Sequence, residues 1–220
     1  MEVNTDKTKV LNQPPPGQTS SSTDAGINGE HLCEVDYFPY LGSILSKTPM
    51  CAKDIENRPK TAHCGYGRFS HRVINNHAIS IRAKIMVFRA ADLSPLLYAC
   101  ETWTLYRRDI KPLESFQLRK LRQLLNTRWE ERLSNNEILK LALLHSVEAT
   151  ILQHRLRWGG HVVQMDLSRG SWWRKKTHGR PTLRYKDQLK WSLKQAGINP
   201  QSWEQLSDDR APWRRKPGTV

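Results

Sequence analysis

The chain has 220 residues, 38% of them hydrophobic, and a formal net charge of +14 at pH 7. This length suits one ordinary domain or two small ones with a modest core. The sequence has no apolar run of about 18 residues, so we expect no membrane span. The N-terminal MEVNTDKTKV lacks the apolar segment of a secretion signal, so we expect the protein in the nucleus or the cytoplasm.

The positive charge is distributed unevenly along the chain. Residues 1–50 have three lysines against six acids, a balance of −3, whereas residues 51–220 carry +17. Such a surplus suits a polyphosphate partner, because each phosphate that a protein neutralises releases condensed counterions. A generic solvated basic surface explains the composition equally well.

The first part of the chain has two sections of different character. Residues 1–31 are rich in Pro, Gly, Ser, Thr and Asn, and we predict a disordered tail because so few apolar groups cannot offset the entropy of ordering. YFPYLGSILS, Tyr37 to Ser46, has aromatic and β-branched residues around a glycine, which favours a short strand or hairpin. An isolated hairpin is marginal in water, so this one should pack against another element.

Helical spacing begins near Asp54 and is interrupted by breaks. Ser80 is a suitable N-cap for the segment that follows it, and Pro95 should end or kink that helix near Ser94. From Asp109 onward an apolar stripe predicts a helix that packs on one side and stays basic on the other. The stripe consists of Leu113, Phe116, Leu121, Leu124 and Leu125.

The second half contains further capped helices. Ser134 and Glu137 have the spacing of a capping box, and a helix starting at Ser146 should weaken or bend at Gly159 and Gly160. A basic connector, residues 168–184, leads to an amphipathic segment that Gly197 should stop. Asn199 and Pro200 favour the start of a last helix. We divide the chain into the tail, a region 32–130 with the hairpin and the first helices, and a helical region 131–220.

Five blocks of the sequence resemble a known family. They are YFPYLGSIL, SIRAKIMVFRAADLSPLLYACETWTL, LESFQLRKLRQLLNTRWEERLSNNEIL, LRWGGHVVQMD and AGINPQSWEQLSDDRAPWR. Together, in this order and at this spacing, they look like the C-terminal part of the endonuclease-reverse transcriptases that non-LTR (LINE-like) retrotransposons encode. The likeness covers roughly residues 35–215.

The resemblance implies a mainly α fold, a helical bundle preceded by a short β-hairpin that is the remnant of a polymerase palm. Tyr40, Leu41 and Gly42 would belong to the primer grip, and the helices after them to the thumb that holds template and primer. The catalytic aspartates of the family lie upstream of the YLG strand. Pro59, the segment His63–Gly65 and Pro212 depart from the family pattern and put the helices around them in doubt, and the basic connector is shorter than usual. These departures fit a decayed or truncated copy.

The sequence shows no catalytic constellation. Its one adjacent aspartate pair, Asp208 and Asp209, lies at the end of a predicted helix without the β-rich surroundings of a polymerase metal site. The four cysteines have no zinc-ligand spacing. His154 and His161 share a helix face but lack a third ligand, so we expect packing or hydrogen bonding there. We therefore predict no enzyme activity, no metal and no cofactor.

Two groups of basic and aromatic residues are candidates for contact with nucleic acid. Aromatic faces can stack on unpaired bases while cations meet phosphates, and an Arg beside Gly and Pro can enter a narrow minor groove. The groups are Arg107, Arg108, Lys111, Arg119, Lys120, Arg122 and Arg128, and Trp172, Trp173, Arg174, Lys175, Lys176, Arg180 and Arg184. Without a nucleic-acid ligand, the first group would be a solvated helix face and the second an exposed connector.

Three hypotheses follow for the function. The first is a non-catalytic module that grips RNA or an RNA/DNA duplex through its phosphate backbone. The second is a decayed or domesticated helical remnant that has no ligand or serves as a protein-interaction scaffold. The third is a piece of a longer, active polymerase.

Overall fold

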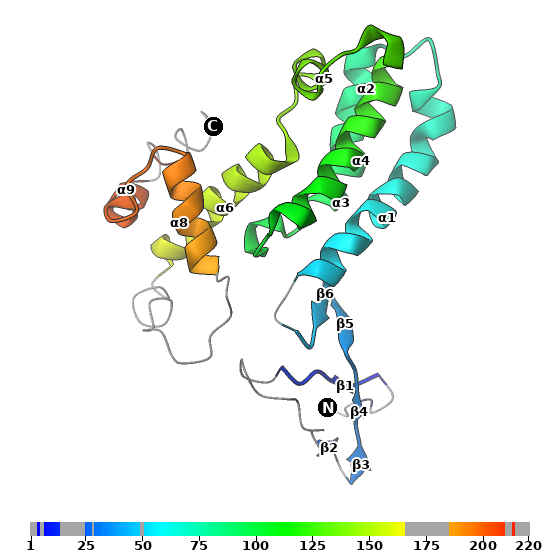
Figure 1. The fold of residues 1–220 in the computed structure, drawn as a ribbon. Coiled ribbons are helices and arrows are strands. Elements are labelled where there is room, and N and C mark those ends of the chain that lie inside the picture. Colours follow the sequence, from blue (N-terminus) through cyan, green and yellow to red (C-terminus); the bar gives the residue numbers. More distant parts are fainter. Residues whose placement is uncertain are drawn as a thin grey trace.

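The computed structural model describes residue 4 and residues 7–13, 25–27, 29–48, 51–165, 185–209 and 213. This part of the chain is mainly helical, as the sequence predicts. Figure 1 shows the long helices α1 and α4 side by side, a hairpin at one end of α1, and α8 and α9 packed along α6. No helix in the described residues is both long and apolar enough to span a membrane.

Short strands precede the hairpin. Strand β1 (Lys9–Val10) pairs in parallel with β4 (Cys33–Glu34), and β2 (Gly26–Ile27) pairs antiparallel with β3 (Glu30–His31). These strands differ from the disordered tail that was predicted for residues 1–31. Pairings of two residues each bury little apolar surface, and so they leave no periodic pattern in the sequence from which to predict them.

The predicted hairpin is present as β5 (Tyr37–Tyr40) and β6 (Ser43–Ser46), paired antiparallel. Its two turn residues, Leu41 and Gly42, have φ angles of 47° and 81°. Positive φ at both positions matches the right-handed twist of the strands, as in type I′ turns. Glycine adopts this conformation freely, whereas Leu41 adopts it at a steric cost.

A buried polar cluster fastens the hairpin to helix α1 (Ala52–Phe69). The Asp54 carboxylate accepts hydrogen bonds from the Ile44 amide at 3.1 Å, from Arg58 Nη2 at 3.0 Å and from the Trp103 indole at 3.1 Å. Arg58 Nη2 also donates to Ser43 Oγ at 2.9 Å. A carboxylate with three donors keeps its charge satisfied away from water. The cluster therefore supplies the packing partner that the hairpin needs.

Helix α1 runs without a break through Pro59 and the segment His63–Gly65, so the doubt about this helix was wrong. Its inward face is buried against neighbouring helices, and tertiary packing outweighs the low helix propensity of proline and glycine. Gly65 has a specific role, because a Cβ there would lie 2.7 Å from the backbone oxygen of Ala91. The buried residues of α1 are Asp54, Ile55, Arg58, Ala62 and Tyr66.

Helix α2 (Ile81–Phe88) starts at the predicted cap, where Ser80 Oγ accepts from the Ala83 amide at 3.3 Å. It continues as a π-helical turn (Arg89–Leu93) into α3 (Ser94–Leu96), so the irregularity precedes Ser94 and the helix ends at Leu96. Pro95 has no amide hydrogen for the Ala91 carbonyl, and the wider turn, in which the Ser94 amide donates to Arg89 O, accommodates this loss.

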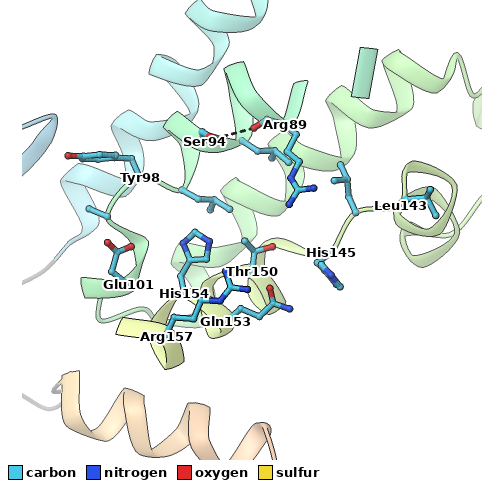
Figure 2. A pocket seen from close by; sticks show the side chains of 14 residues that line it. Arg89, Ser94, Tyr98, Glu101, Leu143, His145, Thr150, Gln153, His154 and Arg157 are labelled. Atoms are coloured by element: carbon cyan, nitrogen blue, oxygen red, sulfur yellow. Dashed lines mark hydrogen bonds between the residues drawn. The ribbon is translucent and has the colours of Figure 1, made fainter. Parts of the chain in front are cut away.

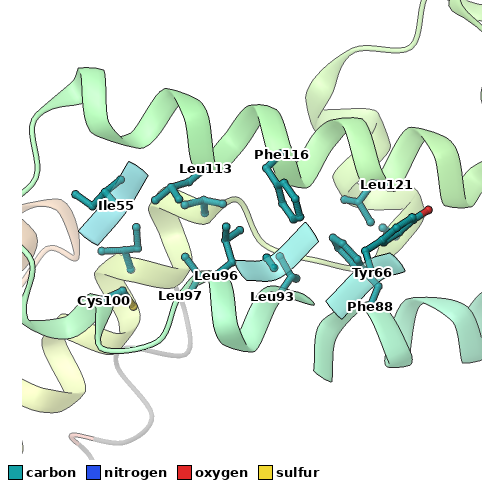
Figure 3. Packing of buried hydrophobic residues seen from close by; sticks show 14 of the residues in the cluster. Ile55, Tyr66, Phe88, Leu93, Leu96, Leu97, Cys100, Leu113, Phe116 and Leu121 are labelled. Atoms are coloured by element: carbon teal, nitrogen blue, oxygen red, sulfur yellow. The ribbon is translucent and has the colours of Figure 1, made fainter. Parts of the chain in front are cut away.

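Helix α4 (Arg107–Leu125) packs its apolar stripe into the first core, as predicted. Figure 3 shows Leu113, Phe116 and Leu121 of α4 facing Ile55 and Phe88 across this core. Leu125, the last stripe residue, is half-buried. The buried residues of the first core extend from Ile55 in α1 to Ile151 in α6. This core therefore includes residues on both sides of position 130, the predicted boundary between the two helical regions.

The predicted caps of α5 (Asn135–Ala142) and α6 (Val147–Gln164) are confirmed. Ser134 and Glu137 form the reciprocal capping box, and Ser146 Oγ accepts from the Ala149 amide at 3.2 Å. Gly159 and Gly160 do not interrupt α6, although the sequence predicted that the helix would weaken or bend there. The helix continues to Gln164, and Gly159 and Gly160 instead leave room for neighbouring side chains.

A second core lies where α8 (Tyr185–Gln195) and α9 (Trp203–Asp208) pack on α6. A Cβ on Gly159 would lie 3.0 Å from the Leu189 side chain, and one on Gly160 would overlap the indole of Trp213. The glycines thus form a groove for these residues. The second core consists of Leu152, Leu156, Leu189, Leu193, Ile198, Trp203 and Trp213.

The C-terminal part corrects one predicted boundary. Gly197, with φ 67°, follows the end of α8 as predicted. Helix α9 begins after Ser202, not at Asn199 and Pro200. Asn199 Oδ1 accepts from the Gln201 amide at 3.0 Å, a local turn that competes with helix formation. Pro212 lies outside the described residues.

Candidate nucleic-acid interface

The solvent side of α4 carries most of the predicted cationic residues. Arg107, Arg108, Lys111 and Arg119 are exposed, and Arg122 is half-buried. Because the apolar stripe is fixed in the core, the orientation of these side chains toward solvent is fixed as well. Arg128, in the segment after α4, is also exposed.

Lys120 was wrongly predicted to face a phosphate, because the structure buries it with 7% of its surface exposed. It follows Phe116 by four residues and Gln117 by three, which places it within the buried stripe. Its ammonium lies 3.7 Å from the centroid of the Tyr66 ring. Burial lowers the pKa of Lys120, Arg119 adds to this effect, and Asp92 opposes it.

Arg119 and Arg122 line a surface hollow of about 500 Å³ between α4 and the start of α5. Ser115, Leu118 and Asn135 complete its walls. Arg122 Nη2 donates to Asn135 Oδ1 at 2.7 Å, which orients its guanidinium at the edge of the hollow. Two guanidinium groups beside a hydroxyl and an amide form a suitable site for a phosphate group.

At the N-terminal end of α4, neighbouring side chains contact one of the cations, Arg108. The Arg108 guanidinium lies 5.2 Å from the Tyr106 ring centroid and 3.7 Å from the Asp109 carboxylate. Asp109 also accepts from the Tyr106 amide at 2.9 Å as part of the helix cap. Among the ion pairs between described residues, none includes Arg107, Lys111 or Arg119.

A second polar hollow, of about 730 Å³, was not predicted from the sequence. Figure 2 shows Arg89, His145, His154 and Arg157 around it, together with Glu101. These residues come from the turn after α2, the turn after α3, the loop before α6, and α6 itself. No sequence spacing connects them, so only the tertiary structure reveals the hollow.

The two histidines of α6 do not act together. His154 Nδ1 lies 3.5 Å from Cys100 Sγ, so the predicted packing or hydrogen bonding is present for this residue. Burial lowers the pKa of His154, while Glu101 acts in the opposite direction. His161 is exposed, and its ring centroid lies 5.4 Å from that of Trp158.

The three residues predicted as primer-grip-like are together at the exposed end of the hairpin. Tyr40 is 55% exposed and Leu41 is 74% exposed, and Gly42 forms the turn with Leu41. The tip faces Tyr98 after α3, because a Cβ on Gly42 would lie 3.6 Å from its ring. An exposed apolar tip of this kind is suited to contact with another surface.

The adjacent aspartates and the basic connector are the remaining features that were predicted from the sequence. Asp208 ends α9 and Asp209 follows it, and both are exposed at the end of a helix. The basic connector lies outside the described residues. It contains the candidates Trp172, Trp173, Arg174, Lys175, Lys176, Arg180 and Arg184.

Comparison with known proteins finds similarity to a transposon-derived protein. No protein-family model matches the sequence, and no solved structure matches it. The chain is similar to a Caenorhabditis elegans protein described as an uncharacterized transposon-derived protein, with 22% identity over 230 residues. The alignment covers 97% of this chain and 81% of the relative. This similarity along nearly the whole chain points to a transposon-related origin.

Proposed function

We propose that the chain is a non-catalytic nucleic-acid-binding module that grips RNA or an RNA/DNA duplex through its phosphates. In this proposal it corresponds to the thumb and C-terminal part of a LINE-like reverse transcriptase. The observation that carries the proposal is the row of exposed cations on α4, whose opposite face is buried in the first core. The sequence resemblance and the transposon-derived relative support it.

The structure removes part of the support for the hypothesis that the chain is a decayed copy. It depended on Pro59, on the segment His63–Gly65 and on Pro212. The first two lie within the continuous helix α1, and Gly65 fits closely against Ala91. The features taken as signs of decay in this part of the chain are therefore compatible with a packed fold.

The proposal predicts binding that depends strongly on salt and little on sequence. Affinity for a short RNA/DNA duplex, measured by fluorescence anisotropy at several salt concentrations, should fall steeply as salt rises. Replacing Arg119 and Arg122 together with Ala should weaken binding and reduce the slope of log affinity against log salt by about 2, roughly one per phosphate contact. Lys120 is left unchanged because it is buried.

A matched variant separates a specific surface from diffuse charge. Lys190 and Lys194 are exposed on α8, and replacing both with Ala removes the same two charges. This variant should bind nearly as well as the unmodified chain. An equal loss in both double variants would remove α4 from the proposed interface, and no detectable binding at low salt would end the proposal.

A further inference from the structure

Three different metal-ligating groups meet beside the second polar hollow. Cys100 and Glu101 begin a short 3₁₀ helix (Cys100–Thr102), and His154 lies on α6. The thiol sulfur, a carboxylate oxygen and an imidazole nitrogen lie within 4.8 Å of one another. Cys100 Sγ and His154 Nδ1 lie 3.5 Å apart.

The backbone holds the first two groups in place. Ala99, just before Cys100, has φ 60°, a left-handed conformation that is uncommon for a residue with a side chain. Backbone hydrogen bonds fix the turn on both sides, from the Cys100 amide to Leu97 O at 3.2 Å and from the Trp103 amide to Cys100 O at 3.3 Å. This turn follows α3 and places Cys100 against α6.

We propose that Cys100, Glu101 and His154 bind a zinc-type divalent cation. Thiolate, imidazole and carboxylate are the usual zinc ligands. Neighbouring ligand atoms of a tetrahedral zinc ion lie about 3.5 Å apart, given metal–ligand distances of roughly 2.0–2.3 Å. Cys100 and His154 already have this separation, and the carboxylate of the partly exposed Glu101 needs to approach by no more than about an ångström.

The charges of the site balance. A thiolate and a carboxylate together neutralise a divalent cation, so a zinc ion would leave no net charge beside the buried Cys100. Binding releases the thiol proton of Cys100 to solvent, and the sulfur then forms the bond to the metal. Burial raises the pKa of the Cys100 thiol to about 12, and the Glu101 carboxylate adds to this effect, while Arg155 and Arg58 act in the opposite direction. Metal coordination deprotonates a thiol even where burial opposes ionisation.

Three protein ligands leave a fourth position open. Glu101 and His154 line the hollow of about 730 Å³, and Arg157 and Gln153 lie near His154 on the same wall. A water molecule or an anionic oxygen from solvent would occupy this position. No metal was predicted from the sequence, because the four cysteines lack zinc-ligand spacing and His154 was paired only with His161, without a third ligand.

The direct test uses cobalt as a spectroscopic probe for zinc. Titrating the purified full chain with Co²⁺ should produce a thiolate-to-cobalt charge-transfer band in the near ultraviolet, and Zn²⁺ should displace it. Cys100→Ser should abolish the band. Cys64→Ser, which changes an exposed cysteine on α1, should leave it intact.

Two further variants keep the test independent of the buried cysteine. Glu101→Gln and His154→Gln should each weaken Zn²⁺ binding, measured by competition with a chromophoric chelator, at least about tenfold. His161→Gln removes an exposed histidine of the same helix and should have no effect. Circular dichroism confirms that each variant is folded.

Two results overturn the proposal. One is the absence of a charge-transfer band in the unmodified chain with excess cobalt, which leaves only a thiol–imidazole hydrogen bond. The other is a band that survives in folded Cys100→Ser or disappears in Cys64→Ser, which places the metal elsewhere.

Discussion

Asp92 shows how one residue in the first core depends on its surroundings. It is 1% exposed, and its Oδ1 has no hydrogen-bond partner among the described residues. Burial raises its pKa to about 6 from 3.8, and the nearby Lys120 partly offsets this effect. Lys120 itself is held over the Tyr66 ring. Lys120, which the sequence places on a basic helix, is therefore a buried residue that contacts Tyr66 and favours the charged form of Asp92.

Asp92 should make stability depend on pH. The folded protein keeps the Asp92 proton at pH values where the unfolded chain has lost it, so the free energy of unfolding should fall as pH rises from about 4 to about 6. The loss should be on the order of 3 kcal/mol. Urea unfolding across this range, compared with Asp92→Asn, measures it, because the amide cannot ionise and should flatten the slope.

An exposed aspartate provides the comparison for this experiment. Asp208→Asn, at the end of α9, should keep the same slope as the unmodified chain. If Asp92→Asn also keeps that slope, ionisation of Asp92 does not control stability.

At the scale of elements, α1 shows how neighbours decide which residues a helix tolerates. Gly65 and Gly67 lie two positions apart on this helix, and sequence rules treat them alike. A Cβ on Gly65 would meet the Ala91 backbone, whereas a Cβ on Gly67 would meet nothing within 4 Å. The difference arises from the approach of the turn after α2, which no local pattern in α1 reveals.

The two glycines should respond oppositely to alanine. Gly65→Ala should destabilise the protein by about 1 kcal/mol, because displacing the Ala91 backbone costs roughly 1–3 kcal/mol and exceeds the gain in helix propensity. Gly67→Ala should stabilise it by up to about 1 kcal/mol. Thermal unfolding of both variants measures the changes. Stabilisation by both would show that α1 and the turn after α2 are not in close contact.

At the scale of the whole molecule, Arg155 connects the two cores. This residue of α6 is 2% exposed, and its guanidinium donates to Trp103 O and to Ser192 Oγ, each at 3.0 Å. Trp103 belongs to the first core, and Ser192 is buried on α8 beside the second. Burial lowers the pKa of Arg155, which reflects the cost of keeping this charge inside the protein.

Removing this connection should uncouple the two cores. Arg155→Leu should cost about 2 kcal/mol, in the range for hydrogen bonds to a charged group. It should also raise the hydrogen-exchange rates of α8 and α9 more than those of α1 and α4. Mass spectrometry of exchanged peptides measures both regions. Arg157→Leu, at an exposed position of the same helix, should change neither, and a uniform increase across the chain for Arg155→Leu would contradict the assigned role.

The sequence by itself determined the elements whose causes are local. The side-chain caps at Ser80, Ser134 and Ser146, the stripe of α4 and the hairpin within Tyr37 to Ser46 were predicted because each depends on residues within a few positions of one another. The exposed arginines of α4 follow from the same periodicity. Their role in binding nucleic acid stays a prediction.

Only the tertiary structure decided what depends on distant neighbours. Lys120 is buried because the buried face of α4 includes polar residues beside its apolar stripe. Helix α6 continues through Gly159 and Gly160, which leave room for side chains of α8 and for Trp213. Cys100 and His154 are 54 positions apart, and no spacing rule connects them. Tertiary packing brings together residues that lie far apart in the sequence. A local sequence pattern cannot predict such contacts.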